Sequence, residues 1–160
     1  HRHLPTEIFG LLAHHNVTPR QIVLEITGSQ DLPSSPIWRE TANHLRALGI
    51  GLAMGDFGSG YSSMEQLLEF PFTHVKIDRV ITHAHERPGA ADLASAIAAM
   101  TSGSGMVTIV ECIDTHEQLT AMRQAGYQLG QGFLFHRPEP LADVMASVTS
   151  SAETRTEGPS

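Results

Sequence analysis

The chain alternates short apolar runs with amphipathic stretches, and turn residues separate the segments. A parallel sheet requires this rhythm, because each strand must be followed by a crossover, usually a helix, before the next parallel strand. We therefore predict an α/β fold of about five parallel strands with helical crossovers. The predicted strands are 21–27, 49–57, 73–80, 106–114 and 127–135, and the predicted helices are 4–15, 35–48, 62–70, 89–100 and 115–126.

Several predicted helices carry recognisable signals at their ends. Pro36 suits the first helical position, where its missing N–H has no intrahelical partner to lose, and Gly49 suits the end of the same helix. Thr115 and Gln118 have the spacing of a capping box, and Gly126 follows as the stop. These signals support helices between the apolar runs.

Five such units fit either a (β/α) barrel or a doubly wound sheet, because both are built from right-handed βαβ units. Periodicity alone does not choose between them. In both folds ligands bind at the carboxyl ends of the strands. Polar residues gather at or just after those ends, and several carboxylates beside a lysine favour a site for divalent metal and phosphate. They are Glu25, Asp56, Lys76, Asp78, Glu111, Asp114 and Gln131.

Composition excludes some partners. Acidic residues outnumber Lys plus Arg by 17 to 10, giving a formal charge of −7, so we expect no general attraction to nucleic acid or anionic membranes. No apolar stretch approaches the roughly 20 residues of a membrane span, and no leader opens the chain. The single cysteine, Cys112, excludes an intrachain disulfide and fits a reducing, cytoplasmic compartment. We interpret it as a small buried hydrophobe rather than a nucleophile.

Five motifs carry a family resemblance: "VLEIT", "GDFGSGYSSM", "HVKIDR", "IVECIDT" and "LGQGFLFHRP". In this order and at these spacings they resemble the EAL-domain family of cyclic di-GMP phosphodiesterases, from near residue 4 to about residue 145. The resemblance implies a modified, here partial, TIM barrel and hydrolysis of one phosphodiester of cyclic di-GMP with two Mg²⁺ or Mn²⁺ ions. It also implies one EAL-like domain over 1–148 lacking the family's N-terminal part. The polar composition of 149–160, which is low in apolar residues, predicts a disordered tail.

The resemblance assigns roles residue by residue. Lys76 matches the catalytic lysine that holds the attacking water. Glu25, Asp56 and Glu111 match metal ligands, which in the family are hard oxygen donors. The supporting or ligand-binding positions are Asp78, Asp114, Gln131, Gly132 and Arg79.

Other positions depart from the family pattern. Gly55 stands where the family has the aspartate that bridges the two metals, and Gly28 replaces a glutamate that supports the metal-binding loop. Asp114 stands where the family has a glutamate, which has a longer side chain, and Cys112 stands where the family has a glycine. The Glu-Ala-Leu signature and the metal-binding asparagine are not in these 160 residues. We therefore predict a degenerate, catalytically inactive domain that serves cyclic di-GMP signalling as a ligand-sensing or protein-interaction module, with weak or lost metal binding.

Two alternatives stay open. One is a cyclic di-GMP phosphodiesterase that is active only with a missing N-terminal half, and the other is a protein-binding module with no nucleotide affinity. For a nucleotide-binding domain, we expect weak binding through backbone N–H groups of the 55–60 turn and of Gln131 and Gly132, with charge from Arg79. Because about five strands cannot close a barrel, we also expect exposed strand edges that a homo-oligomer, a protein partner or a rearranged terminus covers.

Overall fold

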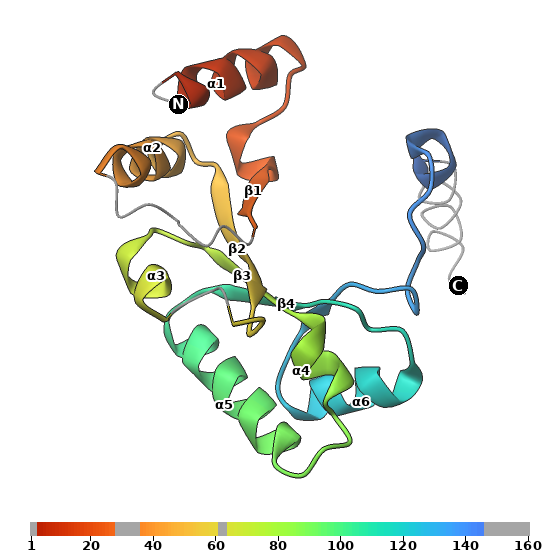
Figure 1. The fold of residues 1–160 in the computed structure, drawn as a ribbon. Helices are drawn as coiled ribbons and strands as arrows, with labels where there is room; N and C mark the ends of the chain where they lie inside the picture. Colours follow the sequence, from red (N-terminus) through yellow and green to blue (C-terminus); the bar gives the residue numbers. More distant parts are fainter. Residues whose placement is uncertain (1–2, 28–35, 61–63, 146–160) are drawn as a thin grey trace, which may run out of the picture.

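The computed structural model describes residues 3–27, 36–60 and 64–145 (Figure 1). Gly28 and the predicted tail at 149–160 lie outside the described residues. The helices are α1 (Leu4–His14), the 3₁₀ turn η1 (Pro19–Gln21), α2 (Pro36–Ala47), α3 (Met64–Glu69), α4 (Arg79–His83), α5 (Ala90–Gly103) and α6 (His116–Gln124). The strands are β1 (Val23–Ile26), β2 (Gly51–Phe57), β3 (His74–Ile77), β4 (Val107–Val110) and β5 (Leu129–Gly130).

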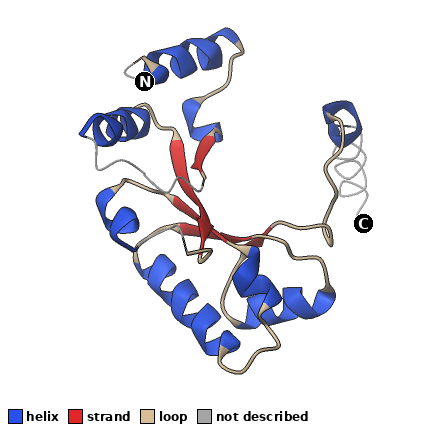
Figure 2. Cartoon of the chain, in the orientation of Figure 1, coloured by secondary structure: helices blue, strands red, loops and turns tan. Residues whose placement is uncertain are grey.

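The five strands form one parallel sheet in the order β1-β2-β3-β4-β5. Each strand pairs with its neighbour in sequence, as in barrel winding, whereas a doubly wound sheet reverses its strand order at a switch point. Within the described residues β1 and β5 each pair on one side only, so the sheet stays open (Figure 2). The α/β fold and the partial barrel are confirmed, and so are the exposed strand edges.

The core lies on the central strands. All but one of the residues of β2 are buried, and β3 contributes Val75 and Ile77 with no exposed surface. A parallel sheet is normally covered on both faces, which explains the continuous apolar run of β2. The outer strands are less covered: β1 alternates exposed and half-buried residues, and both residues of β5 are exposed. The buried part of the sheet therefore lies at its central strands, β2 and β3.

All five predicted strands were longer than the observed strands; the one predicted over 106–114, for example, ends at Val110. Local bonds explain two of the early ends. The strand predicted over 73–80 ends at Ile77, because Asp78 caps a new helix: its Oδ1 accepts the backbone N–H of Val80 at 2.8 Å. The strand predicted over 127–135 keeps only Leu129–Gly130. After it the chain turns, and the carbonyl of Gly132 accepts the N–H groups of Phe135 and His136. Local capping and turn bonds ended both strands early.

Helices were predicted more closely than strands. The helix expected over 35–48 is α2, Pro36–Ala47, and the capping box of Thr115 and Gln118 opens α6 as expected. In the view of Figure 1, α2, α3 and α5 lie along one side of the sheet. No helix among the described ranges is long and apolar enough to cross a membrane.

Candidate functional site at the carboxyl ends of the strands

Lys76 joins two carboxylates from different strands. Its Nζ lies 2.8 Å from Oε2 of Glu25 on β1 and 2.5 Å from Oε1 of Glu111, which follows β4. Only 14% of the Lys76 side chain is exposed, against 33% for Glu25 and 18% for Glu111. The parallel sheet brings the carboxyl ends of β1, β3 and β4 to the same edge, as the sequence predicted. We call Glu25, Lys76 and Glu111 the rim cluster.

Gly55 provides space for the rim cluster. It is a buried residue of β2, between β1 and β3. A Cβ at this position would lie 2.7 Å from Oε1 of Glu25 and 3.2 Å from Cγ2 of Thr27. The Glu25 carboxylate thus rests one oxygen against the Gly55 backbone while the other accepts from Lys76. Any side chain at residue 55 would have to displace Glu25.

Asp56 sits at an irregular point of β2. The β2–β3 register runs from Met54 opposite Val75 to Phe57 opposite Ile77, so one extra residue bulges from β2. Asp56 has a left-handed backbone with φ of 54°, a conformation that Asp adopts more readily than most residues. Its carbonyl accepts both the N–H and the hydroxyl of Ser59. This turn fixes its backbone, and the candidate metal role of its side chain stays a prediction.

A second left-handed residue follows Glu111. Cys112 has a φ of 57°, at the position where the family resemblance expects glycine. The hydroxyl of the fully buried Thr82 donates to the carbonyl of Glu111 at 2.8 Å and holds this turn from α4. Burial raises the pKa of the Cys112 thiol, and the nearby carboxylates of Glu111 and Asp114 raise it further. This shift disfavours the thiolate that a cysteine nucleophile requires.

Replacing Cys112 with glycine is expected to stabilise the domain by about 1 kcal/mol. A left-handed backbone costs a non-glycine residue about 1–2 kcal/mol, and glycine removes this cost. Part of the gain is offset because glycine has more conformational entropy in the unfolded state. Urea unfolding of the parent and of Cys112→Gly measures the difference. Asn16→Gly is the matched control, since Asn16 has a similar φ of 55° but is a residue type that tolerates it. A gain at Asn16 equal to that at Cys112 would contradict the assignment of strain.

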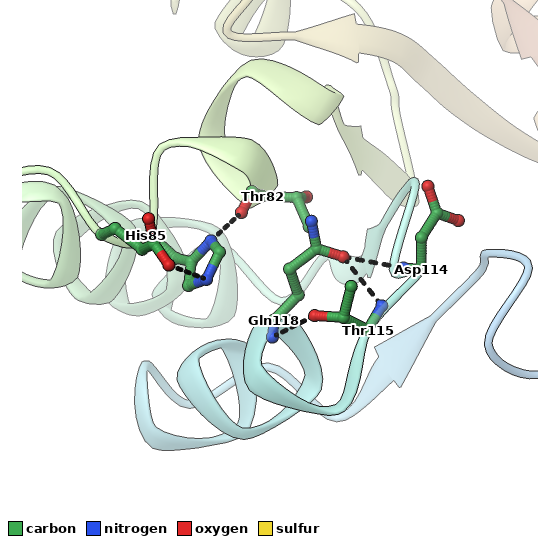
Figure 3. A network of polar contacts seen from close by, with 6 residues as sticks. Thr82, His85, Asp114, Thr115 and Gln118 are labelled. Atoms are coloured by element: carbon green, nitrogen blue, oxygen red, sulfur yellow. Dashed lines mark hydrogen bonds and ion pairs between the residues drawn. The ribbon is translucent and has the colours of Figure 1, made fainter.

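Asp114 organises the loop after β4. Figure 3 shows the Gln118 side chain of α6 beside this loop, where its Oε1 accepts the N–H groups of Asp114 at 2.8 Å and Thr115 at 3.1 Å. Oδ1 of Asp114 in turn accepts the N–H of Phe133 at 3.0 Å. Asp114 therefore ties the 131–134 turn to the capped start of α6, which is a structural role.

The remaining predicted site residues surround this loop. Asp78 is the N-cap of α4, and Arg79 begins the helix with an exposed side chain. Both residues directly follow β3, at the carboxyl end of the sheet. Their charges act on the pKa of the Cys112 thiol in opposite directions: Arg79 lowers it and Asp78 raises it. The N–H of Gln131 donates to the carbonyl of Val110 at 2.8 Å, so the prediction that this N–H is offered to phosphate was wrong. This N–H instead forms a backbone hydrogen bond between the ends of β4 and β5.

Gly132 packs against backbone. A Cβ on Gly132 would overlap the backbone N, C and O atoms of Ile113. The N–H of Ile113 donates to the carbonyl of Gln131, and the carbonyl of Ile113 accepts the N–H of Leu134. The two loops thus pack backbone to backbone beside the rim, and only glycine fits.

Alkaline pH tests the ion pairs of Lys76. Desolvation lowers its pKa, but hydrogen bonds and charge from Glu111 and Glu25 outweigh this, so the pKa rises above 10.5. Because the pKa of Lys76 is higher in the folded state than in the unfolded state, its ion pairs contribute fully to stability below the unfolded-state pKa. This contribution is lost as the pH rises through the folded-state pKa. The hydroxyl of Tyr127 donates to the carbonyl of Ala94, and burial raises the pKa of Tyr127 to about 12. This raised pKa also makes the folded state less stable as the pH rises.

We therefore expect the unfolding free energy to fall steadily as the pH rises above about 10.4. Urea titrations across this range measure the decline. Lys76→Met and Tyr127→Phe should each flatten part of it, because each removes one titrating group. A parent protein whose stability does not change over this range would contradict the raised pKa values.

The family resemblance implies a two-metal centre, which needs several carboxylate or other oxygen ligands around each ion. Across residues 3–27, 36–60 and 64–145, no group of three or more His, Cys, Asp or Glu side chains could hold a metal ion. Glu25 and Glu111 direct carboxylate oxygens at the same ammonium group, and Gly55 supplies no donor side chain. Divalent magnesium needs near-octahedral oxygen coordination. The described residues do not fit a two-metal centre.

The fold and the site define a class: a partial (β/α) barrel with an acid–lysine cluster at the carboxyl ends of its parallel strands. The model of the EAL domain family matches residues 1–138. The chain therefore belongs to the EAL domain family, and the resemblance found in its motifs is confirmed.

Individual relatives agree with this membership. The chain is 36% identical over 142 residues to the cyclic di-GMP phosphodiesterase RocR of Pseudomonas aeruginosa, covering 87% of this chain and 36% of RocR. A structure of the PaMucR phosphodiesterase in complex with c-di-GMP matches with a TM-score of 0.79 and 29% identity, over 90% of this chain and 59% of that chain. A manganese/cy-diGMP complex of Klebsiella pneumoniae BlrP1 gives a TM-score of 0.77 and 26% identity, over 83% and 34%. The chain thus spans about a third of RocR.

Proposed function

We propose that this chain is a degenerate EAL domain that binds cyclic di-GMP without hydrolysing it and acts as a ligand-sensing module in cyclic di-GMP signalling. One observation carries the proposal: the carboxylates of Glu25 and Glu111 are bridged by Lys76 beside a glycine at position 55. Phosphodiester hydrolysis by two metals needs cations that generate the nucleophile and neutralise the transition state. The ammonium of Lys76 alone does not generate the nucleophile as a metal ion does, and it does not replace two cations at the transition state.

The ligand class rests on the relatives. PaMucR was solved with c-di-GMP, and RocR bears the name of a cyclic di-GMP phosphodiesterase. In this chain, Arg79 presents an exposed cation beside the rim, and a guanidinium suits phosphate oxygens. We also propose a domain over 1–148 with a separate tail at 149–160, and a cytoplasmic setting that a single cysteine supports.

Calorimetry with cyclic di-GMP, in parallel with a turnover assay in Mg²⁺ and in Mn²⁺, tests the proposal. We expect saturable binding with a Kd weaker than about 1 μM, since only part of a barrel rim is present, and no linear dinucleotide product. Arg79→Ala should weaken binding several-fold, whereas Arg39→Ala, remote on α2 and paired with Glu69, should leave it unchanged. Turnover would favour the phosphodiesterase alternative, and absent binding would favour a protein-interaction module.

The open sheet bears on partners. The outer edges of β1 and β5 carry no strand partner within the described residues, and such edges are normally covered. We propose a homo-oligomer or a protein partner at these edges. Light scattering that finds a monomer, together with fast hydrogen exchange along β1, would contradict this.

A further inference from the structure

The short helix α4 carries Arg79, the cation that the proposed function assigns to phosphate. Arg79 is the first of its five residues and is exposed, and it forms no ion pair with another described residue. An isolated helix shorter than about 12–15 residues is marginal in water. Contacts with the rest of the domain must therefore determine where α4 lies and where the Arg79 guanidinium points.

Three contacts attach α4 to the carboxyl ends of three neighbouring strands. Asp78, directly after β3, caps the start of the helix through its carboxylate. The buried Ile81 packs on the turn after β2, where a Cβ on Gly58 would lie 3.3 Å from Cγ1 of Ile81. The hydroxyl of the fully buried Thr82 donates to the carbonyl of Glu111, after β4, at 2.8 Å. This last contact is a directed bond between α4 and the end of β4.

The hydroxyl of Thr82 differs in its target from those of other helical threonines in the chain. Thr41, Thr101 and Thr120 each donate to the carbonyl four residues earlier in their own helix, a common arrangement for helical threonine. Thr82 instead donates to a residue 29 positions ahead. Its bond therefore joins two elements rather than two turns of one helix.

The main chain of Thr82 is held as well. Nδ1 of His85 donates to the Thr82 carbonyl at 3.0 Å (Figure 3). Threonine is branched at Cβ, so its χ1 has few allowed states in a helix. Because Thr82 is bonded at both its carbonyl and its hydroxyl and has no exposed surface, α4 cannot rotate without breaking the bond to Glu111.

We propose that Thr82 is a positioning residue for Arg79: its bond to the Glu111 carbonyl fixes α4 and thereby holds the Arg79 guanidinium where a phosphate of cyclic di-GMP binds. The inference rests on the proposed function and deepens it by naming what orients the phosphate-binding cation. A guanidinium bonds phosphate through N–H groups in a rigid, planar fork, so a small rotation of α4 reduces affinity. Thr82 is fully buried and acts through Arg79.

Calorimetry with cyclic di-GMP on the parent, Thr82→Val, Arg79→Ala and the double variant tests this coupling. Valine keeps the shape of threonine and removes its hydroxyl. We expect Thr82→Val to raise the Kd several-fold in the parent, but by no more than about twofold when Arg79 is already alanine, which is near the limit of ordinary additivity. An equal rise in both backgrounds, or no rise in the parent, would overturn the proposal.

Two further variants separate positioning from stability. Thr82→Ser keeps the donor and should bind cyclic di-GMP as the parent does. Thr41→Val is the matched control, since it removes a buried hydroxyl that donates to a carbonyl of its own helix at the same distance, 2.8 Å. It should lower the Tm without changing the Kd. If Thr41→Val weakens binding as much as Thr82→Val does, lost stability explains both effects and Thr82 is not a positioning residue.

Amide hydrogen exchange without nucleotide tests the structural step. Exchange at Val80 and Ile81 of α4 should be faster in Thr82→Val than in the parent, while exchange in β2 stays the same. Thr82→Ser should exchange as the parent does. Unchanged exchange of α4 in Thr82→Val would mean that the bond to Glu111 does not hold the helix.

A titration of the parent does not depend on any variant folding. Because one bond joins α4 to the Glu111–Cys112 peptide, the amide signals of Val80 and Cys112 should shift together as cyclic di-GMP is added, with one apparent Kd. A shift at Val80 without one at Cys112 would contradict the coupling.

The two proposals fail separately. If the parent binds no cyclic di-GMP, the proposed function is wrong and the role of Thr82 toward phosphate is wrong with it, while the exchange of α4 still shows whether Thr82 anchors the helix. If the parent binds and Thr82→Val binds equally well, the function stands and the positioning role is wrong.

Discussion

Replacing Gly132 with alanine is expected to destabilise the domain by ~4 kcal/mol. The new Cβ would overlap the backbone of Ile113, which cannot rotate aside as a side chain can. Relief would require the 131–134 turn and the loop after β4 to separate, breaking the bonds between Ile113 and Gln131 and between Ile113 and Leu134. Urea unfolding monitored by circular dichroism measures the loss.

Gly10→Ala is the control for this prediction. Gly10 lies inside α1, and a Cβ there meets no atom within 4 Å. Alanine in a helix interior is favoured over glycine by up to about 1 kcal/mol, so this variant should be more stable than the parent. If Gly132→Ala unfolds at the same urea concentration as the parent, the backbone contact between the two loops is wrong.

The second large effect is expected at Gly55. Gly55→Asp should lower the unfolding free energy by about 2 kcal/mol, because its Cβ displaces Glu25 and its carboxylate adds a third negative charge around Lys76. Gly55→Ala also displaces Glu25 but adds no charge, so its unfolding free energy should fall by only about 1 kcal/mol. The difference between the two variants measures the charge contribution.

Metal distinguishes the same variants. Millimolar Mn²⁺ should raise the Tm of Gly55→Asp more than that of the parent or of Gly55→Ala, because only the aspartate adds a donor. The reversion should not create turnover of cyclic di-GMP, since one acid does not complete a two-metal centre. Identical Mn²⁺ responses in all three proteins would show that residue 55 does not face the carboxylates of the rim cluster.

Much of the fold could be predicted from the sequence because its signals are local. Pro36 at the start of α2 and the capping box of Thr115 and Gln118 depend on neighbours a few residues away. Strand ends were harder to predict: Asp78 follows the apolar Ile77 and Gly132 precedes the apolar run 133–135, but both make capping or turn bonds. Apolar patterning does not distinguish a strand that continues from one that stops at a turn.

The sequence predicted that polar strand-end residues converge at one rim, but not the contacts they make there. The strand-end rule brought Glu25, Lys76 and Glu111 to one rim, where the structure confirms that they meet. The sequence marked Gly55 as a missing acid, but the packing of Glu25 against its backbone depends on a rotamer and on the β2 bulge. Thr82 was missed altogether, because nothing in a lone threonine of a short helix indicates a bond to the Glu111 carbonyl.

The sequential strand order has a consequence for how the chain folds. Every ladder in the described sheet joins strands that are adjacent in sequence, so β1 can pair as soon as β2 is available and each later unit adds to an existing edge. Pairing strands that are neighbours in sequence costs less chain entropy than closing the two ends of the sheet on each other. During synthesis from the N-terminus, the β2–β3 centre can therefore consolidate before β5 leaves the ribosome.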